Sequence, residues 1–110
     1  MIIGNIRKPP VNSTWPVYRY VRVDRVSPLG NPFKVGQAGD RDLVIEMYRE
    51  YLPDAYHNVL AVRDAVDQLV EYETHSERET VLLCWCHPKA CHASVIIDFV
   101  NNKLSELGNL

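Results

Sequence analysis

A short apolar segment near the C-terminal end, TVLLCWC at residues 80–86, constrains the fold of this chain more than any other feature. It holds no charged residue, and it is bounded by the polar run Glu73–Glu79 and by His87-Pro88. This length and apolar density are typical of a strand that is buried on both faces. The sequence therefore predicts a central strand that needs other elements to cover it.

The other segments alternate between strand-like and helix-like patterns. Val17–Val26 alternates Val with Tyr and Arg, which is typical of a strand with one buried face. Asp40 is a good N-cap for a helix, Pro53 is expected to end that helix, and Gly108 supplies a stop for the last one. The expected elements are Ile2–Ile6, Val17–Val26, Arg41–Leu52, Ala55–Tyr72, Thr80–Cys86 and Cys91–Leu107. This β-β-α-α-β-α order predicts a small α/β sandwich with a mostly parallel sheet.

Length and composition exclude several classes of protein. With 110 residues, 46% hydrophobic and 24% charged, the chain is expected to form one globular domain over residues 1–110 rather than a disordered, collagen-like or coiled-coil structure. A net charge of −2 argues against binding to nucleic acid mainly through bulk charge, although a local basic patch stays open. No apolar run is long enough for a membrane, and the N-terminus does not look like a signal peptide. We therefore expect a cytoplasmic protein with no membrane partner and with reduced cysteines.

The residues with the most chemistry lie close together near the C-terminal end. All three cysteines and two of the four histidines fall within the nine residues Cys84–His92. If residues 80–86 form a strand, Cys84 and Cys86 point to the same face. If the last helix begins at Cys91, then Cys91 and His92 lie in its first turn, where free N–H groups favour negative charge. The carboxyl end of a parallel strand is also the usual ligand position in an open α/β sheet.

Three interpretations of this cluster stay open. Zinc is a candidate cofactor, bound by Cys84, Cys86 and Cys91 together with His92 or His87. Alternatively Cys91 is a reactive thiol in an anion- or nucleotide-binding pocket, beside His92. The third interpretation is that the cysteines only fill the core. A disulfide-linked or redox protein is disfavoured in a reducing compartment.

A second segment, SPLGNPF at residues 27–33, is the candidate second half of the site. Gly30 suits a tight turn, and Asn31 presents an amide. Arg25, at the expected end of the second strand, is suited to pair with a phosphate or carboxylate. Arg41 opposes the dipole at its helix start and therefore needs a partner, either a ligand or an acidic neighbour. No phosphate-binding loop motif is present.

The two tryptophans have different expected roles. Trp85 alternates with the cysteines along the predicted strand, so it is expected to pack on the opposite face. Trp15 lies in a loop bounded by prolines, and it is the better candidate to stack on a base.

The pairing of SPLGNPF with CWCHPKACHASVI at residues 84–97 resembles a phage and bacterial family known only as domain of unknown function 4326. The resemblance covers Val21–Phe99. The matching positions are Arg25, Gly30, Asn31, Pro32, Phe33, Arg41, Tyr48, Tyr51, Cys84, Trp85, Cys86, Pro88, Cys91 and His92. The resemblance implies a Rossmann-like small domain that handles nucleotides or nucleic acid.

The leading hypothesis is a protein that binds or processes a nucleotide or a nucleic-acid-related anionic ligand. Its candidate ligand-binding residues are Arg25, Gly30, Asn31, Arg41 and Cys84. Its candidate catalytic residues are Cys91 and His92. The alternative is a zinc-stabilised interaction module without catalysis, with Cys84, Cys86, Cys91 and His92 as ligands. The leading hypothesis requires two segments far apart in the sequence to meet at one hollow.

Overall fold

The computed structural model describes residues 1–14 and 17–108, and its elements follow the predicted order β-β-α-α-β-α. The strands are β1 (Ile2–Asn5), β2 (Arg19–Arg22) and β3 (Thr80–Cys84). The helices are α1 (Arg41–Asn58), α2 (Leu60–His75) and α3 (Ala93–Gly108). The α/β class is thus confirmed. Trp15, the expected stacking residue, lies outside the described residues.

Strand β3 is the centre of the sheet. Within the described residues the sheet has three strands in the order β1-β3-β2, and both neighbours run parallel to β3. In register, Ile2 lies opposite Val81 and Arg19 lies opposite Thr80. All five residues of β3 are buried. The prediction of a central strand covered on both faces is therefore confirmed.

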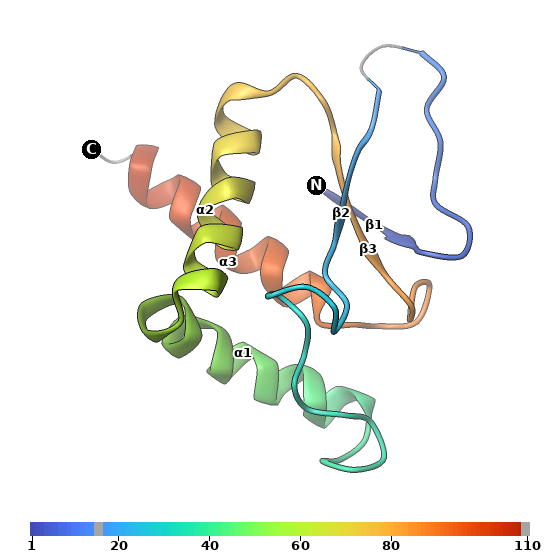
Figure 1. Cartoon of the computed structure of the whole chain (residues 1–110), viewed down its shortest axis with the longest axis vertical. Helices are drawn as coiled ribbons and strands as arrows, with labels where there is room; N and C mark the ends of the chain where they lie inside the picture. Colours follow the sequence, from blue (N-terminus) through green and yellow to red (C-terminus); the bar gives the residue numbers. More distant parts are fainter. Residues whose placement is uncertain (15–16, 109–110) are drawn as a thin grey trace.

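The two faces of the sheet are covered by different parts of the chain. Figure 1 shows the helices on one side of the strands and residues 6–14, which follow β1, on the other. Leu82 and Cys84 belong to the hydrophobic core that the helices share. On the opposite face, a Cβ atom at Gly4 would lie 2.6 Å from Pro10 and 3.0 Å from Val81. Successive residues of β3 thus face the helices and the N-terminal segment in turn.

Helix α1 runs through Pro53, so the prediction that this proline ends the helix is wrong. Pro53 is exposed, whereas Leu52 and Ala55 beside it are buried in the core. Burial of these neighbours holds the helical path although the proline removes one backbone hydrogen bond. The break comes at Val59, whose backbone is extended, with φ −119° and ψ 108°. For that reason α2 begins at Leu60 rather than at Ala55.

Two strands are shorter than expected, so Arg25 and Cys86 lie in loops beyond the strand ends. β2 ends at Arg22 rather than at Val26, because the chain turns where the N–H of Ser27 bonds the Asp24 carbonyl at 2.9 Å. β3 ends at Cys84, and α3 begins two residues later than expected. In the described part of the chain, no helix combines the length and the apolar character that a bilayer-spanning segment needs.

Candidate functional site

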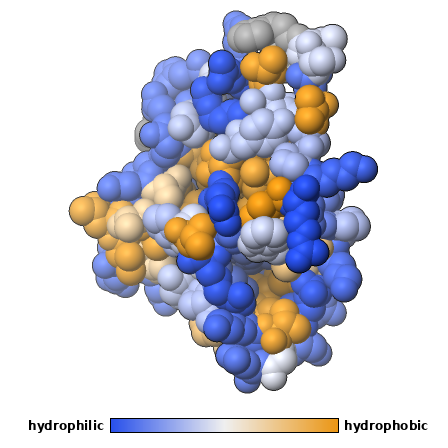
Figure 2. Space-filling model, turned by 45° about the vertical axis from the view of Figure 1, so that its right-hand side comes forward, coloured by the Kyte–Doolittle hydropathy of each residue, from blue (hydrophilic) through white to orange (hydrophobic). Residues whose placement is uncertain are grey.

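A pocket of about 260 Å³ opens at the carboxyl ends of β2 and β3. Its walls come from the loop after β2 (residues 24–35), the start of α1 (41–45) and the segment between β3 and α3 (84–92). This edge is where open α/β sheets usually bind ligands. Figure 2 shows apolar surface set between strongly hydrophilic side chains on the face that the turned view brings forward. The two segments that the sequence analysis paired therefore line one hollow.

Most of the candidate residues line this pocket. They are Arg25, Asn31, Arg41, Cys84, Cys86, Cys91 and His92. Gly30 does not line the pocket, because it packs against the turn behind it. A Cβ atom there would lie 2.6 Å from the Asp24 carbonyl oxygen and 2.6 Å from the Arg25 Cα atom. Gly30 thus lets the turn close behind the pocket wall.

Asn31 fastens the loop to helix α1. Its side-chain amide donates to the Val44 carbonyl at 3.1 Å, and its side-chain oxygen accepts from the Phe33 N–H at 2.9 Å. The residue is only 8% exposed. Both polar ends of Asn31 are therefore used inside the protein, and the residue shapes the pocket wall rather than offering a free amide.

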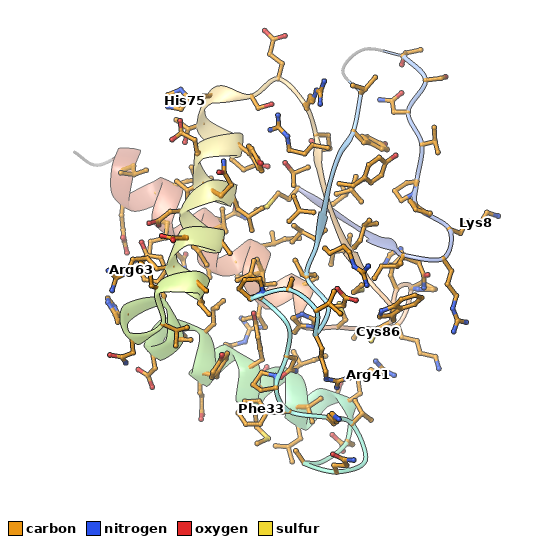
Figure 3. All side chains as sticks on the ribbon, viewed as in Figure 1. Lys8, Phe33, Arg41, Arg63, His75 and Cys86 are labelled. Carbon is orange, nitrogen blue, oxygen red and sulfur yellow. The ribbon has the colours of Figure 1, made fainter. Side chains whose placement is uncertain are left out.

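Two arginines supply the positive charge of the pocket. Arg41 donates through Nη1 to the Ala90 carbonyl at 3.1 Å. The sequence analysis expected a partner for Arg41 because of its position at the helix start, and that partner is a backbone oxygen. Asp40 is occupied elsewhere, since its carboxylate accepts from the Leu43 N–H at 2.9 Å. Arg25 is exposed and forms no hydrogen bond or ion pair with any described residue. Figure 3 shows Arg41 in the same corner of the molecule as Cys86.

The carboxylate of Asp24, on the pocket wall, is neutralised within the protein. Asp24 forms an ion pair with Arg22 and accepts a 2.9 Å hydrogen bond from the indole N–H of Trp85. The hydrogen bond from Arg22 is the main reason that the pKa of Asp24 lies below its usual value. The expectation that Trp85 packs on the far face of β3 is wrong, because the strand ends before it. Its ring is 51% exposed at the pocket, and the Arg7 guanidinium lies 5.6 Å from its centre.

Cys84 and Cys91 are in direct contact at the base of the pocket. The Cys91 thiol donates to the Cys84 sulfur at 3.1 Å. This hydrogen bond, together with the backbone N–H groups of His87 and Cys86, lowers the pKa of Cys84 to about 6. Because Cys91 donates in that bond and is buried, its own pKa is raised. The direction of these shifts favours ionisation at Cys84, although the Ala93 N–H also donates to the Cys91 sulfur at 3.3 Å. The interpretation of Cys91 as the reactive thiol stays a prediction.

His92 is a buried structural contact as well as a pocket residue. Its Nε2–H donates to the Val23 carbonyl at 2.6 Å, which ties the start of α3 to the turn after β2. The imidazole also packs edge-on against Tyr48, with ring centres 4.9 Å apart. Burial lowers the pKa of His92, so the ring is neutral. Among the described residues no hydrogen bond joins this ring to a cysteine.

The four candidate zinc ligands do not form a metal site in this geometry. Across residues 1–14 and 17–108, no group of three or more His, Cys, Asp or Glu side chains is arranged to hold a metal ion. His92 forms a hydrogen bond through Nε2 to a backbone carbonyl, and the Cys91 thiol forms a hydrogen bond to the Cys84 sulfur. The arrangement therefore does not fit the tetrahedral Cys3His set that the spacing suggested.

Comparison with known proteins gives a family. The family described as "Domain of unknown function (DUF4326)" matches residues 10–102. The chain belongs to this family. The matched range includes both segments of the pocket, so the whole site lies within the DUF4326 domain. No curated protein and no solved structure matches the chain.

The roles of two residues at or beneath the DUF4326 pocket were not predicted from the sequence. The predicted strand Val17–Val26 included Asp24, although Ser27-Pro28 after it is a turn signal that favours an earlier strand end. Tyr48 was named only among the positions that match the family, with no structural role. It is fully buried, and its hydroxyl donates to the Leu29 carbonyl at 2.8 Å. Tyr48 thereby supports the turn from below.

Proposed function

We propose that this DUF4326 protein binds a small anionic ligand in the pocket, and that a nucleotide is the ligand class that fits best. The observation that carries the proposal is the Arg25 guanidinium, which faces the pocket without a partner among the described residues. Arg41 lies on the same pocket and keeps part of its guanidinium free of the Ala90 carbonyl. Two guanidinium groups at one hollow favour a phosphate or carboxylate.

The apolar part of the pocket supports a ligand that also carries a planar group. Phe33, Val35, Val44 and Ile45 contribute to its walls. Trp85 adds a half-exposed indole whose N–H is fixed by Asp24, so the ring is a rigid surface on which a base stacks. At about 260 Å³ the pocket is slightly smaller than typical ligand sites, which begin at roughly 300 Å³. That size suits a mononucleotide or a single nucleotide at the end of a nucleic-acid strand.

The distribution of charge supports an anionic ligand as well. Residues 7–8, 22–42 and 85–92 surround the carboxyl ends of the three parallel strands. They carry seven of the twelve Lys and Arg residues but only three of the fourteen Asp and Glu residues. This end of the molecule therefore has a net charge of +4 in a chain whose net charge is −2. Figure 3 shows Lys8 and Arg41 on the side of Cys86, with His75 at the far end.

The test is calorimetric titration of mononucleotides and short single-stranded DNA into the wild type and two arginine variants. Arg25→Ala should weaken binding at least tenfold, because it removes the unpartnered guanidinium. Arg78→Ala is the matched control, since Arg78 is exposed before β3 at the opposite end of the sheet. It should change affinity less than twofold. Absence of binding by the wild type, or equal binding by Arg25→Ala, would remove the proposal.

The alternative of a zinc-stabilised interaction module has its own measurement. Elemental analysis of protein purified without a histidine tag, and melting with and without a chelator, would detect a structural metal. About one zinc per chain with chelator-sensitive melting would favour the module. The geometry favours the anion pocket instead, because His92 and the two buried cysteines form hydrogen bonds within the protein, where zinc ligands would bind the metal.

A further inference from the structure

The contact between Cys84 and Cys91 is close enough to permit a bond. Their sulfur atoms are 3.1 Å apart, and a disulfide requires about 2.05 Å, so roughly 1 Å of approach separates the two states. Six residues lie between them, and Trp85 and residues 88–90 of that loop are exposed. A small adjustment of this kind therefore does not require the repacking of a buried segment.

The pair is also reachable from solvent. Cys84 is 1% exposed and Cys91 is 6% exposed, yet both line the pocket that opens at the carboxyl ends of the strands. A small molecule that enters the pocket meets the sulfurs at its base, whereas a large reagent does not reach them. A pair of cysteines that only filled the core would have no such opening.

We propose that Cys84 and Cys91 form a two-electron redox site that hydroperoxides oxidise through the pocket. Cys84 attacks, since Cys91 and the backbone N–H groups of Cys86 and His87 donate toward its sulfur. The thiolate of Cys84 bonds to the outer oxygen of the peroxide, the O–O bond breaks, and the leaving alkoxide or hydroxide takes a proton from water. The product is a sulfenic acid on Cys84.

Cys91 then completes the reaction. Its sulfur attacks the Cys84 sulfur, the S–O bond breaks, and the hydroxyl leaves as water with the proton of the Cys91 thiol. Two thiols and one hydroperoxide thus give one disulfide, one alcohol and one water, or two waters from hydrogen peroxide. A dithiol reductant reverses the change by thiol–disulfide exchange. In a reducing compartment the pair rests as thiols and responds when peroxide rises.

Cys86 provides the matched control within the same pocket. It is more exposed than the other two cysteines, and it has no hydrogen bond from its thiol to any described residue. A site defined by exposure alone would react at Cys86. A site defined by the contact reacts at Cys84 and Cys91.

The experiment treats the full chain with hydrogen peroxide at pH 7, blocks the remaining thiols with a maleimide, and maps the products by intact and peptide mass spectrometry. The wild type and Cys86→Ser should each lose two free thiols and 2 Da, with the link between peptides carrying Cys84 and Cys91. Their oxidation should be at least tenfold faster than that of glutathione, and dithiothreitol should restore the thiols. Cys91→Ser should stop at a sulfenic acid on Cys84 that dimedone traps.

Two results would overturn the proposal. One is a disulfide that includes Cys86. The other is two free thiols remaining at Cys84 and Cys91 under conditions that oxidise glutathione fully. Since Cys91→Ser risks a loss of folding, the wild type and Cys86→Ser decide the matter alone. The readout needs no ligand, so its failure is distinct from failure of the nucleotide proposal.

Discussion

The turn after β2 leaves no room for a side chain at Gly30. A Cβ atom at Gly30 would lie too close to main-chain atoms of Asp24 and Arg25. Main-chain atoms cannot move aside as the end of a flexible side chain would. Behind the same turn, Tyr48 and His92 bond to the carbonyls of Leu29 and Val23. The shape of the pocket therefore depends on a closed backbone turn that is fastened from below.

Replacing Gly30 tests this dependence. Gly30→Ala should lower the free energy of unfolding by about 1–3 kcal/mol, because the added methyl forces the turn open. Gly108→Ala is the control, since a Cβ at Gly108 meets no atom within 4 Å. Urea denaturation of both variants measures the difference. A stability of Gly30→Ala equal to that of the control would contradict the close approach.

Residue-scale chemistry was only partly predictable. The sequence identified Cys84, Cys91 and His92 as a group, because their spacing along a strand and a helix start is visible in the chain. The protonation pattern was not visible, since it depends on which sulfur receives the hydrogen bonds. Helix α3 begins at Ala93, so Cys91 lies before its first turn rather than within it.

At the scale of elements, pattern and burial give different boundaries. The apolar period along each segment predicted the order and type of all six elements. It misplaced the ends of α1 and β2, because packing against the core decides the first end and a local turn decides the second. In α1 the burial of Leu52 and Ala55 outweighs the local effect of Pro53. In β2 the turn held by Asp24 and Ser27 cuts short an alternating pattern.

The cost of the proline inside α1 is measurable. Pro53→Ala should raise the free energy of unfolding by about 1–2 kcal/mol, since it restores a backbone N–H, while greater freedom of the unfolded chain offsets part of the gain. Glu50→Ala, an exposed change in the same helix, should alter stability by less than about 0.5 kcal/mol. Chemical denaturation compares the two. A loss of stability in Pro53→Ala would show that the ring makes a favourable contact.

At the scale of the whole molecule, Asp24 joins parts that are far apart in sequence. Its carboxylate bonds Arg22 at the end of β2 and Trp85 just beyond β3. These hydrogen bonds stabilise the ionised carboxylate of Asp24, and for that reason its pKa is lowered. Their contribution to stability is complete above the ordinary value of 3.8 and is lost as the pH falls through the lower pKa of the folded state.

A comparison across pH isolates this contribution. Asp24→Asn should be less stable than the wild type at pH 7, and the gap should shrink steadily below about pH 4. The exposed Asp64→Asn should follow the wild type throughout, because no hydrogen bond or ion pair joins the Asp64 side chain to the described residues. Thermal melting from pH 2 to pH 7 records both gaps. A pH-independent difference for Asp24→Asn would show that its role is packing alone.

The strand order β1-β3-β2 determines when the sheet can form during protein synthesis. β1 and β2 emerge early from the ribosome, but each is paired with β3 in the sheet, and β3 begins only at residue 80. Until then the nascent chain carries two strands that lack β3, the strand with which both form hydrogen bonds. The pocket also lacks Cys84, which lies at its base. The sheet therefore cannot assemble until β3 has been synthesised and has left the ribosome. A premature stop anywhere upstream leaves a fragment that chaperones or proteases must handle.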